Sequence, residues 1–476
     1  MSSAAELERA LAESPAIRAA RDALAPAEGV WIVGGAVRDA LLGREVTDVD
    51  LAVDGDPADA ARAVGRAANG HPFELSDEFA MWRVQARERP WRVDVAAMRG
   101  GSIEADLGGR DFTVDAIAVP LAGGELVDPH GGAADAERRV LRAVGEGAFE
   151  RDPLRIMRAA RIAAALGLRI DDATLELARG SAARAAEPAG ERQLAELRAI
   201  VAGSDPLGGL RLMDELGATA AVLPELEALR GVEQNPYHHL DVHGHTMEVL
   251  ERVLELEADP GAVLGDIGPD VAALLAEPLA DELSRGDGLR LAALFHDLGK
   301  PRTRSVAPNG RILFIGHDEA GAEIIRGICA RLRASRRLTS YLEALTLNHL
   351  RLGFLVHERP LSPRQVYDYL VATEPETVDV TVLTVADRLA TQGPRTRLEA
   401  IDAHLELARE VIAEGLAWRH TGPPRSPIRG DELAAELGID RGPELGRLLA
   451  EIEAARFAGE VSTREDAVDL ARRLVS

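Results

Sequence analysis

Cysteine, lysine and aromatic side chains are scarce in this chain of 476 residues. Cys329 is the only cysteine, which excludes an internal disulfide and a metal cage built from several cysteines, and suits a reducing compartment. Lys300 is the only lysine, so arginine carries nearly all of the positive charge. Because aromatic residues make up only 3% of the chain while alanine is abundant, the composition indicates a packed and largely helical protein.

The sequence also lacks long hydrophobic runs. No stretch reaches the roughly 18 apolar residues that a membrane helix needs, and the start of the chain lacks the basic and apolar segments of a signal peptide. We therefore expect a cytoplasmic protein with no membrane partner. The formal net charge of −24 opposes non-specific attraction to nucleic acid, so any contact with RNA must come from local groups of arginine.

The length favours two to four domains, because one hydrophobic core rarely serves so long a chain. Residues 30–128 alternate β-like runs with helical stretches such as residues 57–68, which predicts a small α/β head. The predicted strands are residues 30–33, 49–53, 92–96 and 113–119. The expected domains are a head (1–134), a helical neck (135–232), a histidine-bearing helical domain (233–398) and a helical tail (399–476). Residues 258–270, which are rich in Asp, Gly and Pro, are predicted to form a loop.

A pair of glycines follows the first predicted strand. Gly34 and Gly35 lack side chains, so backbone amides at the start of the next helix can close on a triphosphate. Arg38, one turn into that helix, adds positive charge. Taken alone, such a pair is more often only a tight turn, so the nucleotide site depends on the residues that follow.

Two carboxylates lie on the next predicted strand. Asp48 and Asp50 are two residues apart, so both side chains project from one face and can share divalent cations. Nucleotidyl transfer needs this arrangement, because one metal ion helps to deprotonate the attacking 3′-hydroxyl and another neutralises the triphosphate and the pyrophosphate. Asp94, which alternates with valines on a later strand, is the candidate third carboxylate. Solvated acids at a strand end are the alternative, but they do not account for the glycine pair and Arg38 at a fitting distance along the chain.

Several motifs, in order, resemble those of one enzyme family. The segments GGAVRDALLGREVTDVD, GRDFTVDAIAV and DPHGGAADAERRVLRAVG are similar to the first three motifs of the bacterial tRNA nucleotidyltransferases and poly(A) polymerases, of the polymerase-β-like superfamily. The similarity continues into the tail and covers nearly the whole chain. It implies an α+β fold: a small polymerase-β-like nucleotidyltransferase head that binds Mg²⁺, followed by a mainly α-helical neck, an HD domain and a tRNA-binding tail. It also implies template-independent addition of CCA, or only CC, to the tRNA 3′ end from CTP and ATP.

Three arginines recur at every third position on a helix that is predicted to begin near Asp152. From the residues alone, Arg155, Arg158 and Arg161 form either a solvent-facing row of ion pairs or a surface that reads a base. A carboxylate can accept from the amino group of cytosine or adenine, while a guanidinium donates to the neighbouring ring acceptor. The resemblance implies that Asp152 and Arg155 act in this way. It places Arg158 and Arg161 nearer to the phosphates or the base.

The resemblance also implies that Arg110 and Asp111 contact the nucleotide, with Asp111 at the ribose 2′-hydroxyl. Three positions depart from the family pattern: Gly109 stands where the family has an arginine, Asp115 where it has an asparagine, and Arg151 where it often has an acid.

A fourth departure is the short segment between the third carboxylate and the second motif, where the family usually has a long, flexible, charged loop. Relatives that add only CC lack this loop. We therefore hypothesise that the chain adds only CC, with full CCA addition as the alternative.

Histidine and aspartate residues recur in the predicted third domain. Placed on separate helices, such residues can converge on one metal ion, which activates water toward a phosphate ester. A lone histidine is more often a packed or capping residue, but the order here resembles that of the HD phosphohydrolase superfamily, including the extra ligands of binuclear members. The resemblance implies a divalent transition metal and a phosphatase or phosphodiesterase, with 2′,3′-cyclic or damaged RNA ends as candidate substrates. The candidate ligands are His245, His296, Asp297, His317, His349 and Asp387. We expect the nearby His238, His239 and His243 to be surface groups or neighbours of the ligands.

Three other functions fit part of the sequence. A poly(A) polymerase shares the head motifs but usually carries a basic C-terminal extension, whereas this tail is acidic. An HD phosphohydrolase with an inactive head is disfavoured by the intact Asp48, Asp50 and Arg38. A non-catalytic RNA-binding protein has no need of paired carboxylates beside a phosphate cradle.

Overall fold

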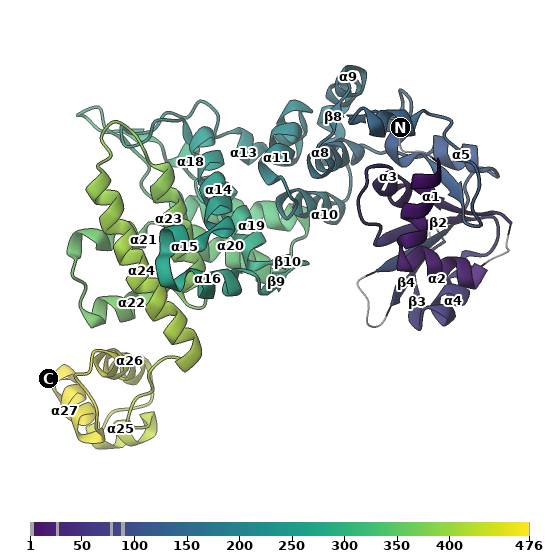
Figure 1. The fold of residues 1–476 in the computed structure, drawn as a ribbon. Helices are drawn as coiled ribbons and strands as arrows, with labels where there is room; N and C mark the ends of the chain where they lie inside the picture. Colours follow the sequence, from purple (N-terminus) through teal and green to yellow (C-terminus); the bar gives the residue numbers. More distant parts are fainter. Residues whose placement is uncertain (1–3, 25–27, 77–79, 87–90, 476) are drawn as a thin grey trace. The chain divides into compact units, whose positions relative to one another are not determined.

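The computed structural model describes residues 4–24, 28–76, 80–86 and 91–475 (Figure 1). The chain forms two compact units: the first comprises Met1–Pro188 and Gly203–Val222, and the second comprises Ala189–Ala202 and Leu223–Ser476. No helix in these described segments is both long enough and apolar enough to cross a membrane. The four-domain division stays a prediction.

A six-stranded sheet forms the centre of the first unit, with strand order β3-β4-β5-β2-β1-β6. Only β2 and β5 run parallel among its neighbouring pairs, and their register places Asp50 beside Asp94. The strands are β1 (Val30–Val33), β2 (Asp48–Val53), β3 (Gly70–Ser76), β4 (Met81–Ala86), β5 (Arg92–Ala97) and β6 (Ala118–Pro120). The predictions of strands at 30–33, 49–53 and 92–96 are therefore confirmed, as is a helix at 57–68, which is α4 (Pro57–Ala67).

The predicted strand at residues 113–119 is wrong over its first half. Thr113–Asp115 forms a 3-10 turn, and the strand begins only at Ala118. The Thr113 hydroxyl donates to Asp135 at 2.7 Å, and its backbone N–H donates to Arg142 at 2.8 Å, which draws this part of the chain away from the sheet. The turn brings Asp115 toward the glycine pair.

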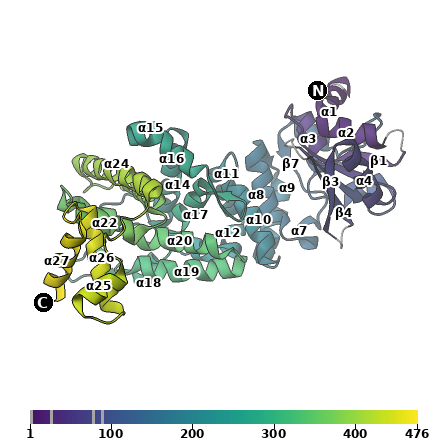
Figure 2. The same ribbon diagram turned by 90° about the horizontal axis from the view of Figure 1, so that it is seen from below.

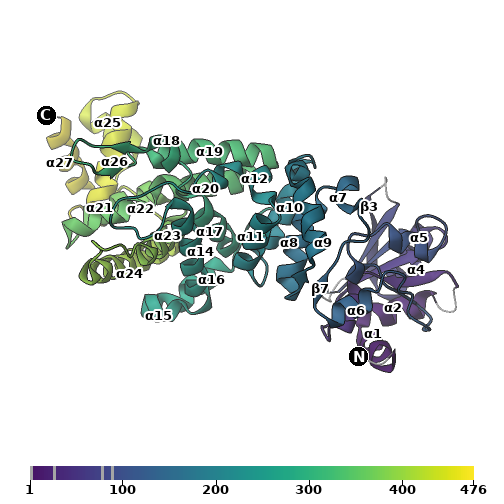
Figure 3. The same cartoon turned by 90° about the horizontal axis from the view of Figure 1, so that it is seen from above.

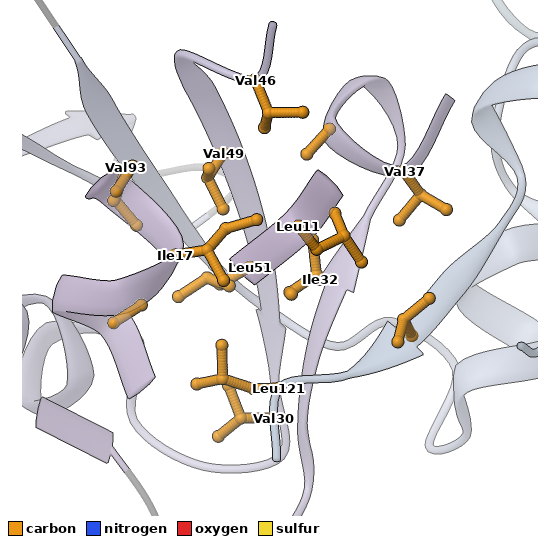
Figure 4. Packing of buried hydrophobic residues seen from close by; sticks show 14 of the residues in the cluster. Leu11, Ile17, Val30, Ile32, Val37, Val46, Val49, Leu51, Val93 and Leu121 are labelled. Atoms are coloured by element: carbon orange, nitrogen blue, oxygen red, sulfur yellow. The ribbon is translucent and has the colours of Figure 1, made fainter. Parts of the chain in front are cut away.

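Helices α1 (Ala4–Glu13), α2 (Pro15–Leu24) and α4 pack with the sheet and close the core of the head. Leu11 and Ile17 on the helices point toward Ile32 and Leu51 on the strands (Figure 4). All four side chains are buried. Burial of each such side chain contributes about 1.5–3 kcal/mol, so this core fixes the strands that carry the candidate carboxylates.

The rest of the first unit is mainly helical, as predicted for the residues after 135. Gly167, with φ 62°, ends α8 in the left-handed conformation that a glycine adopts at low cost. A two-stranded parallel pair, β7 (Val140–Leu141) and β8 (Arg169–Ile170), is the exception. The helices are α3 (Gly35–Leu41), α5 (Ile103–Gly108), α6 (Gly132–Glu137), α7 (Ala148–Arg151), α8 (Arg155–Leu166), α9 (Asp172–Ser181), α11 (Pro206–Glu215) and α12 (Ala218–Val222). Figure 2 labels α7, α8, α9, α11 and α12 among them.

The second unit is built around α14, α17, α20 and α23, which pack against one another (Figure 3). Its larger helices are α10 (Gly190–Val201), α14 (Val242–Ala258), α17 (Arg285–Phe295), α19 (His317–Leu332), α20 (Arg336–Asn348), α22 (Pro363–Thr373), α23 (Thr377–Ala390) and α24 (Leu398–Thr421). Its short elements are α13 (Pro224–Glu227), α18 (Lys300–Thr303), α21 (Arg351–Leu355), the hairpin of β9 (Pro278–Ala280) and β10 (Leu283–Ser284), and that of β11 (Ser305–Val306) and β12 (Ile312–Leu313).

The predicted loop at residues 258–270 is wrong. The segment instead forms α15 (Pro260–Leu264), a 3-10 turn (Gly265–Ile267) and the start of α16 (Gly268–Leu275). Asp259 caps α15 by accepting the N–H of Ala262 at 3.2 Å, and a proline occupies the first turn, where its missing N–H costs nothing. The Asp and Pro that suggested a loop are therefore helix-start signals.

The tail folds around a small core of its own. Helices α25 (Gly430–Leu437), α26 (Pro443–Phe457) and α27 (Arg464–Val475) lie together beside the C-terminus (Figure 1). Leu433, Leu448 and Ile452 are fully buried among them.

Candidate functional site

The glycine pair lies at the edge of a cavity of about 450 Å³ in the first unit. Gly34 has φ 68° and precedes α3; a Cβ at this position would lie 2.6 Å from Nη1 of Arg110 and 3.5 Å from Oδ2 of Asp50. The backbone conformation favours glycine, and a Cβ here would displace the Arg110 guanidinium. Arg38 also lines the cavity, and its Nη1 donates to Oδ1 of Asp115 at 2.5 Å.

Two of the three candidate carboxylates meet in this cavity. Asp50 and Asp94 are neighbours on parallel strands, and both line the cavity. The side chain of Asp48 projects from the same face of β2 but is 55% exposed, lies outside the cavity lining and pairs with Arg92 at 2.8 Å. Desolvation raises the pKa of Asp50 to about 6, and nearby carboxylates add to this shift although the charge of Arg110 opposes it. Crowded carboxylates of this kind fit a divalent cation, because its charge relieves their repulsion.

The arginines of α8 form another wall of the same cavity. Arg155, Arg158 and Arg161 all line it, so they are not a solvent-facing row. The Asp111 carboxylate pairs with Nε of Arg155 at 2.5 Å and with Nη1 of Arg158 at 2.7 Å. Asp152 precedes α8, accepts the N–H of Leu154 at 3.2 Å and is not part of the lining. The structure therefore brings the three arginines and Asp111 together in the lining; Asp152 is outside the lining, but its charge acts on Arg155.

Sequence reasoning missed the arginine that holds the third carboxylate. Arg83 on β4 donates from two nitrogens to the two oxygens of Asp94, each at 2.7 Å. The register of β4 against β5 places the two residues opposite each other. Because β3 and β4 were not predicted, no sequence signal pointed to this pair.

The candidate HD ligands converge in the second unit and form two groups that share Asp297. One group is His245, His296 and Asp297; the other is Asp297, His317 and His349. Within each group the ligand atoms lie within 4.8 Å of one another, and every member is buried. Asp387 completes the first group, because its Oδ1 lies 3.0 Å from Nε2 of His245. All six predicted ligands therefore lie in one cluster.

Backbone carbonyls orient three of the histidines. The Nδ1 atoms of His296, His317 and His349 lie 2.9, 2.7 and 2.5 Å from the carbonyls of residues 293, 314 and 346. A histidine that donates from Nδ1 presents the lone pair of Nε2, which is the form that binds a metal. Nε2 of His245 lies 3.0 Å from Oδ1 of Asp387, and Nε2 of His296 lies 3.2 Å from Oδ2 of Asp297. Buried imidazole nitrogens that face carboxylates in this way fit a divalent metal ion.

Lys300 and His238 belong to this cluster, although the sequence did not assign Lys300 a role. Nζ of Lys300 lies 2.6 Å from Oδ2 of Asp297, and 2.7 Å from the side-chain oxygen of Gln234. Burial by itself raises the pKa of the Asp297 carboxyl. The charges of His296 and Lys300 outweigh this effect and hold the pKa well below its usual range. The ring of His238 packs edge-on against that of His245 at 4.8 Å, and burial lowers the pKa of His238 to about 3. The only signal for Lys300 was its position as the sole lysine, three residues after Asp297.

Three segments of the chain match known protein families. Residues 30–142 match the Poly A polymerase head domain, residues 167–229 match the probable RNA and SrmB-binding site of polymerase A, and residues 242–392 match the HD domain. The first match contains the head cavity apart from its α8 wall, and the third contains all six ligands of the buried cluster.

Complete proteins are similar as well. The chain is 36% identical over 445 residues to an A-adding tRNA nucleotidyltransferase of Deinococcus radiodurans, covering 92% of this chain and 94% of that protein. It is 34% identical over 443 residues to a CC-adding tRNA nucleotidyltransferase of Thermus thermophilus, covering 91% of each. The solved structure of the Thermotoga maritima CCA-adding enzyme complexed with tRNA has a TM-score of 0.59 and 21% identity over 99% of each chain. That structural likeness supports the fold.

Proposed function

This chain belongs to the bacterial tRNA nucleotidyltransferase family, and on that premise we propose that it adds CC to the 3′ end of tRNA and leaves the final A to another enzyme. The relatives include an A-adding, a CC-adding and a CCA-adding enzyme, so membership does not choose the product. One observation carries the choice of CC: the short and tightly held segment between β5 and α5.

This segment consists of residues 98–102. The backbone N–H of Met98 donates to β2 at 2.8 Å, and that of Arg99 donates to the Asp106 carboxylate at 3.1 Å. The Ser102 hydroxyl caps α5 by accepting an N–H of that helix at 3.2 Å. A connection this short cannot contain the long charged loop that is usual in relatives that add A.

The head cavity supplies the parts of a nucleotidyl transfer. In the proposed reaction the tRNA 3′-oxygen attacks the α-phosphorus of CTP, and the bond to the bridging oxygen breaks as pyrophosphate leaves with the electron pair. Asp50 and Asp94, with Asp48, would hold the Mg²⁺ that activates the 3′-hydroxyl and neutralises the leaving group. The Gly34 turn lets the backbone approach the triphosphate, and Arg38 faces the same space.

We assign the choice of base to the start of α8. Asp111 holds Arg155 and Arg158 within the cavity, so two guanidinium groups are oriented before the nucleotide arrives. A guanidinium fixed in this way donates to the ring acceptors of cytosine, and Asp152 would accept from its amino group. Uracil offers a carbonyl in place of that amino group, which leaves buried polar atoms unpaired and disfavours it.

The number of nucleotides added tests the proposal. Three labelled tRNA transcripts, one lacking CCA, one ending in C and one ending in CC, are incubated with CTP, with ATP and with both. We expect extension of the first two to CC with CTP, and no extension of the third. Completion to CCA would show a full CCA-adding enzyme, and extension of only the third transcript by ATP would show an A-adding enzyme.

A second activity is favoured by the two ligand groups that share Asp297. We propose that the HD domain binds divalent transition metal ions and hydrolyses a phosphate ester at an RNA end. In this reaction the oxygen of water forms a bond to phosphorus, and the bond to the alcohol oxygen breaks as the alcohol leaves with a proton. Release of inorganic phosphate from a 3′-phosphorylated oligoribonucleotide with added Mn²⁺, Ni²⁺ or Co²⁺ checks this activity. No release with any of these metals would contradict it.

A further inference from the structure

The head cavity carries acidic side chains that already face its arginines. The carboxylates of its lining are those of Asp50, Asp94, Asp106, Asp111 and Asp115. Asp50 is the only one of them that forms no ion pair with a described residue, and each of the other four faces an arginine. An arginine that faces a carboxylate offers less net charge to an incoming phosphate. The cavity therefore holds its own counter-ions before a nucleotide enters.

The pair formed by Arg38 and Asp115 lies beside the glycine turn. Nη1 of Arg38 donates to Oδ1 of Asp115 at 2.5 Å, and Nε of Arg38 donates to Oδ1 of Asp39 at 2.9 Å. Burial by itself lowers the pKa of Arg38, but the charges of these two carboxylates outweigh burial and raise the pKa. Nη2 of Arg38 lies 3.4 Å from where a Cβ on Gly35 would be. Two negative charges therefore surround the positive charge that Arg38 presents at the turn.

Asp115 also acts on Asp50, a candidate metal ligand. A Cβ on Gly34 would lie 3.5 Å from Oδ2 of Asp50 and 3.7 Å from the carbonyl oxygen of Asp115, so both residues flank one turn. Burial is the main cause of the raised pKa of Asp50; the charge of Arg110 opposes it, and neighbouring carboxylates, Asp115 among them, add to it. The side chain of Asp115 is only 16% exposed, so water screens its charge weakly. If Asp115 releases Arg38, its carboxylate remains near Asp50 as an unpaired charge.

The backbone of Asp115 is held by the 3-10 turn that it ends. Its N–H donates to the carbonyl of Phe112 at 3.0 Å. Within the turn, the Thr113 hydroxyl donates to Asp135 at 2.7 Å, and Val114 is fully buried. The Asp115 side chain can therefore change its partner while the backbone stays in place.

From these contacts we propose that Asp115 holds Arg38 in the place of a phosphate, and that binding of CTP in the head therefore depends on a divalent cation. The triphosphate displaces the carboxylate from Arg38, and the released charge lies near Asp50. Without a cation, two unpaired acids then lie beside an anion, which is unfavourable. A divalent cation offsets this charge, so the cation and the nucleotide strengthen each other's binding.

Asp115 is in this account a positioning residue that acts through Arg38. The inference rests on nucleotide binding in the head, which is part of the proposed function, but not on the number of nucleotides added. Asp115 is also one of the positions at which the chain departs from the family pattern.

The dependence of CTP binding on Mg²⁺ tests this role without turnover, because no tRNA is present. The full-length protein is titrated with CTP in EDTA and in excess Mg²⁺, and the readout is the ratio of the two Kd values. Asp115→Asn keeps the size of the side chain and an acceptor oxygen but removes the charge. We expect Kd in EDTA to fall about tenfold and Kd with Mg²⁺ to change little, so the ratio falls about tenfold.

Two comparisons show whether the effect passes through Arg38. Asp39→Asn is the matched control: it removes the other carboxylate that pairs with Arg38, but Asp39 lies outside the cavity lining, so the triphosphate does not displace it. Its ratio should differ from that of the wild type by less than about threefold. In an Arg38→Gln background, Asp115→Asn should likewise change the ratio by less than about threefold, because the partner through which it acts is gone.

Three results would overturn the proposal. They are an unchanged ratio in Asp115→Asn, a change of equal size in Asp39→Asn, and the full effect of Asp115→Asn without Arg38. An Asp115 that only orients Arg38 gives the first result, because both Kd values then change by the same factor or not at all.

Extension of a tRNA that lacks CCA is measured separately. If the wild type adds nucleotides from CTP but the ratio is the same in Asp115→Asn, the proposed function stands and this role of Asp115 is wrong. If the ratio changes as expected while addition continues to CCA, the proposed product is wrong and the role of Asp115 stands. If the wild type binds CTP in neither buffer, both proposals fail.

Discussion

At the scale of single residues, the head cavity depends on a position without a side chain. Gly34 combines φ 68° with a space in which a Cβ would lie 2.6 Å from Arg110. With ψ −128° as well, this backbone lies outside the left-handed helical region, so a residue other than glycine costs about 1–3 kcal/mol here and also displaces the guanidinium. The second effect reaches the nucleotide, because Arg110 lines the cavity.

Gly34→Ala should therefore impair nucleotide binding more than it impairs folding. We expect Kd for CTP to rise about tenfold, the effect of displacing one charged contact. Gly43→Ala is the matched control: Gly43 has φ 69°, but a Cβ there meets nothing within 4 Å. Both variants place a Cβ at a positive φ, so equal CTP affinities in the two would contradict this role for Gly34.

Asp50, one of the two carboxylates that line the cavity, makes a second residue-scale prediction. Asp50→Asn keeps the shape of the side chain but removes the charge that holds Mg²⁺. Nucleotide addition should fall at least about 100-fold, the loss that is typical when one charge-stabilising group leaves an active site. Asp54→Asn, an exposed change just after β2, should retain activity. Substantial activity in Asp50→Asn would show that the metal binds elsewhere.

At the scale of elements, the sequence predicted the parts that local patterns determine. The strands at 30–33, 49–53 and 92–96 follow from runs of β-branched residues, and the register of the last two places Asp50 beside Asp94. Sequence could not predict Arg83, because its role depends on pairing between β4 and β5. It likewise could not show that Lys300 contacts Gln234, because segments 66 residues apart in the chain must first pack.

The segment that was predicted as a loop yields a test of helix α15. Asp259→Ala removes the side chain that caps this helix, which should cost about 1 kcal/mol locally. Amide exchange of residues 260–264 should become about fivefold faster, with little change elsewhere. Asp266→Ala, an exposed change in the following turn, is the control. Unchanged exchange in Asp259→Ala would mean that the cap does not hold the helix.

At the scale of the whole molecule, the two candidate sites lie in different units of the chain. The head cavity is built by residues of the first unit, and the HD cluster by residues of the second. The head cavity gathers arginine in a strongly acidic protein, which limits attraction for phosphate to defined places.

Independent sites predict separable activities. Asp297→Asn, which weakens the ligand shared by both groups, should abolish metal binding by the HD cluster and phosphate release. Metal content per chain, measured by elemental analysis after dialysis, should fall, while CTP incorporation into tRNA changes less than about twofold. Glu282→Gln, at an exposed carboxylate of the same unit, should change neither quantity. Joint loss of both activities in Asp297→Asn, with the fold intact, would contradict independence.

The central claim is that addition stops after CC. The most direct measurement incubates a tRNA ending in CC with the full-length protein, Mg²⁺ and ATP, and resolves the 3′ end to one nucleotide. A tRNA lacking CCA, incubated in parallel with CTP, shows that the preparation is active. We expect the second tRNA to gain two nucleotides and the first to gain none; efficient conversion of the first to a CCA end would contradict the account.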